Sequence, residues 1–486
     1  MKKKINDFFK VSASGSSFKV EIVAGIVTFL SMAYILTLNP SLITNDWAQA
    51  GPLWASVFIA TALGAIIGTA LMAFVAKMPL AQAPGLGLNS MVGALIGGTA
   101  ALGFKVSFGN AMLLVFISGV IFLLLSVIKI KGVSIREKIF DGIPVQIRTA
   151  ISVGIGLFIA FIGLVNAGII VTGNGTLVGL VAFNNYDAFP AAAIVLLFGL
   201  FAIAVLEHFK VKGAVIIGII LATLLGIPLG VTTYSGMSWK FWEYFANFFS
   251  MDPEKGGTFF ALFTEGLEWV PEATIMPCIM TVISFSMIDM FDTMGTVVGC
   301  ASAAGLVDEN GKPNNYEGIM LSDSVATCAG AVFGTSTVTT FVESGSGVAA
   351  GGKTGLTALS TTICFALAIF LMPLIASIPS AAASSALVYV GCLMLKGAKD
   401  LKVGTVKEAV PAFLTIALMP LSYSITNGIG FGILSYVVLE FFTYIIGLIL
   451  HAINKEKYEK PKWEVSVVCL IVAVLFLVYF FVPTKF

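Results

Sequence analysis

Apolar runs of about 20 residues, the length at which an α-helix crosses a lipid bilayer, recur along almost the whole of this chain. Hydrophobic residues make up 58% of its 486 residues, and charged residues make up 11%. A soluble fold would need far more polar side chains to cover its surface. The sequence therefore predicts an all-α polytopic membrane protein.

The charges in the connections predict how the chain is oriented. We count fourteen candidate spans and one further apolar segment, 463–482. Lys and Arg gather in four connections, 128–138, 207–213, 396–407 and 453–462. The connections 41–51 and 172–187 contain neither. Because Lys and Arg favour the cytoplasmic side, this alternation predicts a cytoplasmic N-terminus and a multi-pass protein of the plasma or inner membrane.

Two of the predicted spans are interrupted, and they hold matching places. Fourteen spans divide into two halves of seven, and an odd number of spans inverts the second half in the membrane. The third span contains LAQAPGLGLNSM, and the tenth contains GTSTVTTFVESGSG. Irregular backbone at membrane depth is tolerated only where it lines a protein cavity. We therefore predict a central site, with half-helices that start near Gly87 and Glu343 and aim backbone N–H groups at a ligand.

Three acids lie in the spans that would surround this site. Asp289 and Asp292 belong to the eighth span, where a spacing of three residues places both on one helical face. Glu343 belongs to the tenth span, and Asn89 belongs to the third. An ionisable residue at bilayer depth costs about 2.5 to 3.5 kcal/mol, so each acid is a candidate functional residue. In a dry site a carboxyl group can also take up and release a proton near neutral pH.

Structural roles are open for some of the same residues. One of the acids can instead cap a broken helix or pair with Lys353. Asn89 follows Gly-Leu-Gly-Leu, so its side chain can cap the half-helix itself. Asp323, in the ninth span, is interpreted as a structural residue.

Six segments give the chain a specific resemblance to a known family. They are VTFLSMAYILTLNPSLI, AQAPGLGLNSMVG, IRTAISVGIGLFIAFIGLVNAGIIV, MFDTMGTVVG, GTSTVTTFVESGSGVAAGGKTGLTAL and ITNGIGFGILSYVVLEF. From about residue 15 to residue 450, the chain resembles the AzgA-like permeases for adenine, guanine and hypoxanthine, within the nucleobase/cation symporter superfamily. The resemblance implies fourteen spans in two inverted repeats, a core domain that moves against a gate domain, and a homodimer.

The resemblance also divides the chain into parts. It implies core spans in 21–130 and 275–377, and gate spans in 147–229 and 383–450. The remaining parts are a cytoplasmic N-terminal segment at 1–20 and an extracytoplasmic loop at 230–274. Residues 451–486 form a basic cytoplasmic stretch followed by the extra apolar segment.

A purine site between the third and tenth spans is the main functional implication of the resemblance. The residues that it assigns to the substrate are Asn89, Asp289, Asp292, Glu343, Ser344 and Gly345. Proton symport through Asp289, Asp292 or Glu343 is predicted on chemical grounds, since these carboxyl groups can titrate and no cage of oxygen ligands for sodium is evident. The uracil and xanthine branches carry a different signature where this chain has FVESGSG, so purines are predicted.

The acids suit a nucleobase on chemical grounds as well. A purine is flat and neutral, and it presents adjacent N–H donors that a carboxylate can accept side by side. An asparagine both donates and accepts, so Asn89 can read a carbonyl. Four aromatic residues are candidates to stack on the ring, namely Phe29, Tyr34, Phe291 and Phe341.

Other functions remain alternatives at this point. The nearest is a transporter of the same architecture for another small solute, such as an anion or a pyrimidine, although fixed acids repel an anion. An intramembrane aspartyl protease is more remote, because its two aspartates would have to face each other from two helices. The segment GVAAGGKT matches the phosphate-loop pattern but follows a membrane span, so ATP binding is not expected. No cofactor or metal site is predicted. A nucleic acid partner is not predicted either, since 27 basic residues balance 26 acidic ones.

Overall fold

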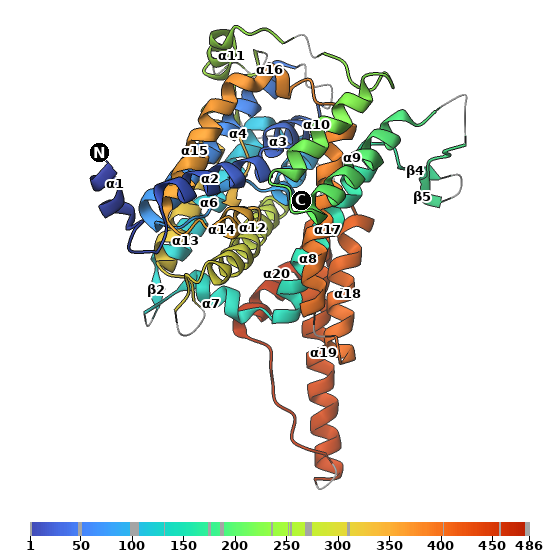
Figure 1. Cartoon of the computed structure of the whole chain (residues 1–486). Helices are drawn as coiled ribbons and strands as arrows, with labels where there is room; N and C mark the ends of the chain where they lie inside the picture. Colours follow the sequence, from blue (N-terminus) through green and yellow to red (C-terminus); the bar gives the residue numbers. More distant parts are fainter. Residues whose placement is uncertain are drawn as a thin grey trace.

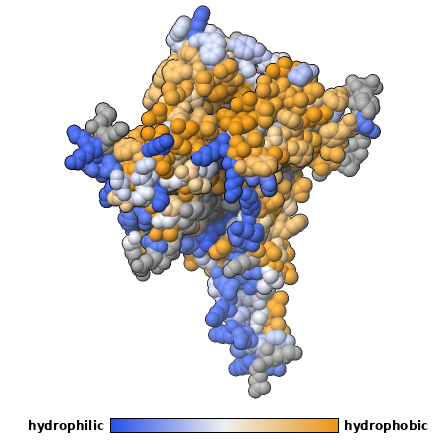
Figure 2. Space-filling view, in the orientation of Figure 1, coloured by the Kyte–Doolittle hydropathy of each residue, from blue (hydrophilic) through white to orange (hydrophobic). Residues whose placement is uncertain are grey.

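The protein folds into a helical body from which one long helix extends downward (Figure 1). The computed structural model describes residues 2–46, 51–97, 106–130, 132–173, 176–184, 189–234, 237–250, 252, 255–267, 275–308, 312–401, 403–455 and 458–481. Hydrophobic residues cover most of the upper body, and hydrophilic residues gather around its lower part (Figure 2).

Nine helical segments of the described residues are long and apolar enough to cross a membrane. They are Phe18–Thr44, Pro52–Ala76, Phe108–Val127, Val145–Asn166, Ala191–His208, Pro277–Val298, Gly355–Ile375, Ser380–Asp400 and Ile425–Ile453. Three shorter apolar helices are Leu86–Gly97, Ala214–Gly226 and Val467–Phe481. The predicted all-α, multi-span architecture is confirmed, and the count of fourteen crossings stays a prediction.

The helices pack mainly within two groups. The first group contains α2 (Phe18–Met32), α3 (Ile35–Thr44), α4 (Pro52–Leu71), α5 (Leu86–Gly97), α6 (Phe108–Val127), α12 (Ile275–Ala303), α13 (Tyr316–Phe333), α14 (Ser344–Ala349) and α15 (Gly355–Ala368). The second group contains α8 (Val145–Asn166), α9 (Ala191–His208), α10 (Ala214–Gly226), α17 (Ser380–Leu395), α18 (Val406–Leu421) and α19 (Ile425–Ile453). Each group therefore combines helices from both halves of the sequence.

Glycine allows the two halves to meet closely inside the second group. A Cβ on Gly391 of α17 would lie 2.6 Å from the carbonyl oxygen of Gly156 of α8, and a Cβ on Gly156 would lie 2.5 Å from the Cβ of Met394. Small residues at such crossings let two helix backbones approach within van der Waals contact, which drives helix association in lipid.

The two interrupted segments meet at the centre of the first group. The strand β1 (Gln82–Pro84) pairs antiparallel with β6 (Val338–Thr340), and each strand is followed by a short helix, α5 or α14. Backbone hydrogen bonds continue the pairing on both sides, because Gly85 N donates to Thr337 O and Phe341 N donates to Ala81 O, both at 3.0 Å. This pairing satisfies backbone groups that could not be left bare at membrane depth. The predicted interruption of both spans is confirmed.

The remaining α-helices and β-strands connect or flank the two groups. They are α1 (Lys2–Phe9), β2 (Lys129–Ile130), β3 (Val133–Ser134), α7 (Ile135–Gly142), β4 (Ile170–Gly173), β5 (Thr176–Leu180), α11 (Phe241–Phe248), α16 (Met372–Ile375) and α20 (Val467–Phe481). The helix α20 packs against α19 of the second group and also contacts α12 and α7. It lies inside the predicted extra apolar segment.

Candidate functional site

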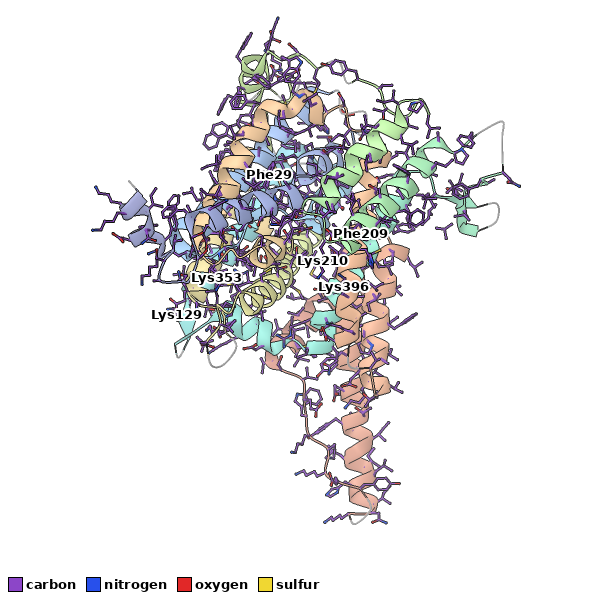
Figure 3. All side chains as sticks on the ribbon, viewed as in Figure 1. Phe29, Lys129, Phe209, Lys210, Lys353 and Lys396 are labelled. Atoms are coloured by element: carbon purple, nitrogen blue, oxygen red, sulfur yellow. The ribbon has the colours of Figure 1, made fainter. Side chains whose placement is uncertain are left out.

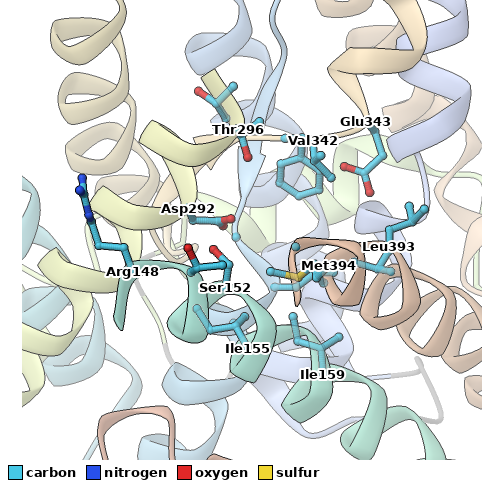
Figure 4. A pocket seen from close by; sticks show the side chains of 18 of the residues that line it. Arg148, Ser152, Ile155, Ile159, Asp292, Thr296, Val342, Glu343, Leu393 and Met394 are labelled. Carbon is cyan, nitrogen blue, oxygen red and sulfur yellow. The ribbon is translucent and has the colours of Figure 1, made fainter. Parts of the chain in front are cut away.

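A cavity of about 520 Å³ lies between the two helix groups (Figure 4). The first group contributes Tyr34, Gly85, Leu86, Gly87, Asp292, Thr296, Thr340, Phe341, Val342 and Glu343. The second group and the turn after α17 contribute Val145, Arg148, Thr149, Ser152, Ile155, Ile159, Val390, Leu393, Met394, Gly397 and Asp400. The starts of both short helices, α5 and α14, thus border the cavity, at the place where the sequence predicts the central site.

Two of the predicted acids line this cavity. Asp292 comes from α12, and Glu343 comes from the turn that starts α14. In Figure 4 their carboxylates enter from different sides of the space above α8. Asp292 Oδ2 accepts a hydrogen bond from Thr339 Oγ1 at 3.4 Å, and Glu343 Oε1 accepts one from the hydroxyl of Tyr34 at 2.5 Å. Both acids therefore present oxygens to a ligand in the cavity.

The cavity wall opposite the acids is not among the predictions made from the sequence. It is formed largely by one face of α8, where Arg148, Ser152, Ile155 and Ile159 recur every three or four residues. The polar members of this face interrupt an otherwise apolar span, and that pattern is the signal that could have identified them. With Met394 of α17, the two isoleucines give the cavity an apolar side opposite its acids.

Asp289 lies behind the cavity wall. It is 2% exposed, and Thr327 Oγ1 of α13 donates to its Oδ2 at 3.1 Å. Its other oxygen, Oδ1, has no hydrogen-bond partner among the described residues. Burying a carboxylate with one oxygen that has no hydrogen-bond partner costs free energy, unless the charge is neutralised, for example by a proton. Its predicted contact with the substrate stays a prediction, and this geometry does not place it on the wall.

Asn89, Ser344 and Gly345 are also absent from the described lining of the cavity. Asn89 is fully buried, its Nδ2 donates to Pro84 O at 3.2 Å, and its Oδ1 accepts from the hydroxyl of Ser336. Ser344 Oγ accepts from Ala81 N at 3.0 Å. The Ser336–Asn89 and Ala81–Ser344 bonds tie the two interrupted segments together. This role differs from the half-helix cap that remained open for Asn89, whose contact with the substrate stays a prediction.

A buried ion pair lies on the other side of α12. Arg136 Nη2 of α7 donates to Asp323 Oδ2 of α13 at 2.8 Å, and both side chains are fully buried. Asp323 Oδ1 also accepts from Thr293 Oγ1 at 2.8 Å and from Gln82 Nε2 at 3.1 Å. The guanidinium lies 3.4 Å from the centre of the Phe122 ring. Asp323 therefore lies in a structural environment, in line with its interpretation from the sequence, whereas the sequence places Arg136 only among the charges of a cytoplasmic connection.

The phosphate-loop pattern has a structural explanation. The end of GVAAGGKT leads into α15, and the backbone N–H groups there are already occupied by a carboxylate. Glu21 of α2 is fully buried and accepts from Lys353 N at 3.1 Å, Thr354 N at 3.2 Å and Thr357 Oγ1 at 2.6 Å. The segment thus binds an internal anion at a helix N-terminus.

The fold and the site together have the features of a transporter. Two helix groups, each drawn from both halves of the chain, enclose a cavity bordered by two interrupted segments. Broken helices at such an interface are typical of secondary transporters, whose substrates bind near the middle of the membrane. The architecture is that of a multi-pass membrane transporter.

The chain belongs to the Permease family whose model is called Xan_ur_permease, which matches residues 19–431. It is 35% identical to the guanine/hypoxanthine permease PbuO of Bacillus subtilis over 483 residues, which cover 98% of this chain and 100% of that protein. It is also 35% identical to the adenine permease AdeP of Escherichia coli over 432 residues, which cover 89% of each. The predicted membership of a nucleobase permease family is confirmed.

A solved structure supports the fold independently of the sequence. The transmembrane domain of the cyanobacterial bicarbonate transporter BicA superposes with a TM-score of 0.57 at 15% identity, covering 84% of this chain and 97% of that domain. A likeness at this identity concerns the fold and leaves the substrate open. The family and its members are permeases, so this chain is a transporter and the alternative of an intramembrane protease is excluded.

Proposed function

We propose that this protein imports purine nucleobases, namely hypoxanthine, guanine and adenine, by proton symport. The observation that carries the proposal is the cavity between the two helix groups, into which Asp292 and Glu343 both point. Carboxylates accept the N–H groups of a base and repel an anion, so the site chemistry disfavours the anion alternative. The relatives PbuO and AdeP, named for guanine and hypoxanthine and for adenine, favour purines.

The acidic side and the apolar side of the cavity match the polar edge and the flat faces of a nucleobase. The acids face the donors on the edge of the ring, and the apolar side formed by Ile155, Ile159 and Met394 suits its flat faces. Of the aromatic candidates, Tyr34 and Phe341 line the cavity. Phe29 instead makes an edge-to-face contact with Phe365, with ring centres 5.1 Å apart. The side chain of Phe291 lies outside the described residues.

Alternating access would follow from movement of one group against the other. We assign the first group to the predicted core domain, 21–130 and 275–377, and the second to the predicted gate domain, 147–229 and 383–450. The cavity reaches Val145 and Asp400, at helix ends beside the basic connections. Figure 3 labels one lysine of each of these two connections, Lys129 and Lys396. Because Lys and Arg favour the cytoplasmic side, the basic connections beside these helix ends support a cavity open to the cytoplasm, with a cytoplasmic N-terminus. The homodimer rests on the family resemblance alone.

The coupled proton would be carried by Asp289, Asp292 or Glu343. Asp289 fits this role without touching the base, because it is buried and one of its oxygens has no partner among the described residues. Moving a charged carboxylate through a closed, dry state is costly, so protonation would be required before the core passes the gate. Asp289→Asn should then keep purine exchange between the two sides and lose accumulation driven by a proton gradient.

Binding of five bases to the purified protein tests the substrate assignment. Thermal shift or calorimetry with hypoxanthine, guanine, adenine, uracil and xanthine should show preferential binding of the first three. Glu343→Gln and Asp292→Asn should each weaken binding about tenfold or more, because a hydrogen bond to a charged group is lost. Glu317→Gln is the matched control, since that acid is exposed and pairs with Lys129. Preferential binding of uracil or xanthine would reject the assignment.

A further inference from the structure

The hydrogen bond between Tyr34 and Glu343 is a direct contact between two residues of the cavity wall. The Tyr34 hydroxyl lies 2.5 Å from Glu343 Oε1, and the two residues are 3% and 9% exposed. A phenol donates to a carboxylate in such a pair. One oxygen of Glu343 is therefore engaged before any ligand arrives.

The backbone around this bond holds both partners in place. Tyr34 stands at the junction between α2 and α3, and Glu343 directly precedes α14. The helices α2 and α14 are in close contact, because a Cβ on Gly347 would collide with Thr28 Oγ1 and Ser346 Oγ donates to Ser31 Oγ at 2.9 Å. The distance between Tyr34 and Glu343 is thus set by helix packing, and a ligand meets a preformed pair.

We propose that Tyr34 is a positioning residue that determines specificity by acting through Glu343. The inference rests on the proposed function and adds a rule for choosing among purines. The hydroxyl holds the carboxylate in one orientation, so that Glu343 Oε2 and the remaining lone pair of the phenol oxygen face the cavity as neighbouring acceptors. While the bond is kept and Glu343 is ionised, this edge of the site offers acceptors and no donor.

Because this edge of the site offers only acceptors, the affinity of a purine should depend on how many adjacent N–H donors it presents. Guanine presents a ring N–H beside an amino group, so two adjacent donors meet two acceptors. In the same orientation hypoxanthine presents its ring N–H beside a C–H, and adenine presents a ring nitrogen without a hydrogen beside a C–H. Hypoxanthine therefore leaves one acceptor of the site unpaired, and adenine places an acceptor of its own against the site; a dry site rejects analogues that leave its polar groups unpaired. Guanine should therefore bind more tightly than hypoxanthine or adenine.

The wild-type protein provides the first test. Uptake of radiolabelled guanine, hypoxanthine and adenine is measured in cells without their own purine permeases, and guanine uptake is competed with the three unlabelled bases. Guanine should compete better than hypoxanthine, which lacks the amino group next to the ring N–H, and better than adenine, which lacks that ring N–H. Equal competition by guanine and hypoxanthine, or stronger competition by hypoxanthine or adenine, would overturn the specificity rule. Failure of every purine to be taken up would instead overturn the proposed function.

Tyr34→Phe provides the second test, since it removes one oxygen and keeps the ring. The KM for guanine should rise about tenfold or more, as expected for a lost hydrogen bond to a charged group, and the KM for adenine should rise less. The matched control is Tyr316→Phe, a buried tyrosine of the same helix group that does not line the described cavity and whose hydroxyl lies 3.5 Å from Met294 Sδ. Equal changes for both bases, a change confined to Vmax, or wild-type kinetics would each show that Tyr34 does not set specificity.

Discussion

Asp323→Asn should strongly destabilise the folded protein, because it removes the charge partner of a buried arginine. Both side chains of the Arg136–Asp323 pair are fully buried. After the change, the described contacts left to the guanidinium are Ser126 Oγ and Met320 O, each at 3.4 Å, and the face of Phe122. Breaking a buried ion pair from one side costs about 3–5 kcal/mol. The free energy of unfolding should fall by that amount, which is a large part of the stability of a typical domain.

The double variant distinguishes the ion pair from general damage to packing. Arg136→Met leaves Asp323 as the unpaired charge, although Thr293 and Gln82 still donate to it. In Arg136→Met with Asp323→Asn, neither charge remains buried. The double variant should therefore be more stable than the sum of the single losses predicts, with a coupling energy within about 0.5–3 kcal/mol.

Thermal unfolding of the purified variants in one detergent measures these effects. The control is Lys129→Met, which breaks a pair that is shorter, at 2.6 Å, but exposed on both sides. Exposed ion pairs contribute little to stability because solvent screens them, so this variant should melt close to wild type. If Asp323→Asn and Lys129→Met melted at the same temperature, the buried pair would not stabilise the fold and the reasoning would be refuted.

Three further outcomes are expected. Glu21→Gln should lower the melting temperature, since it weakens charge-assisted hydrogen bonds at the start of α15 worth about 1.5–3 kcal/mol each; an unchanged melting temperature would contradict this. Gly391→Val should prevent correct folding, judged by size-exclusion chromatography, because its Cβ would lie 2.6 Å from the backbone of α8, whereas Gly404→Val, where the nearest atom is 3.9 Å away, should elute as wild type. Purine uptake into proteoliposomes should fall as external pH rises and should not change when choline replaces sodium; accumulation driven by a sodium gradient alone would rule out proton symport.

Some parts of the site can be predicted from the sequence, because their local chemistry differs from that of their neighbours. Asp292 and Glu343 were visible because a carboxyl group in an apolar span is expensive and so stands out from its neighbours. The two interrupted segments were visible because glycine, proline and hydroxyl residues break an apolar run. Their pairing as β1 and β6 could not be read in this way, because it joins residues more than 250 positions apart in the chain.

The direction in which a side chain points was decided by tertiary packing. Asp289 and Asp292 are separated by about 60° around one helix, which the sequence treats as a single face. In the structure Asp292 lines the cavity, while Asp289 turns toward Thr327 of α13. The rotation of α12 against its neighbours makes this difference, and no local pattern encodes it.

The membrane class, the order of the spans, the two interruptions and the acids can all be predicted from the sequence, because they follow from the cost of placing polar groups in hydrocarbon. The partners of those groups depend on the tertiary fold. It placed the α8 face opposite the acids, joined Tyr34 to Glu343, and buried Arg136 against Asp323. These contacts join segments that are distant in the sequence. They form because a buried charge or polar group needs a bonding partner, and the packing of the helices determines which group lies close enough.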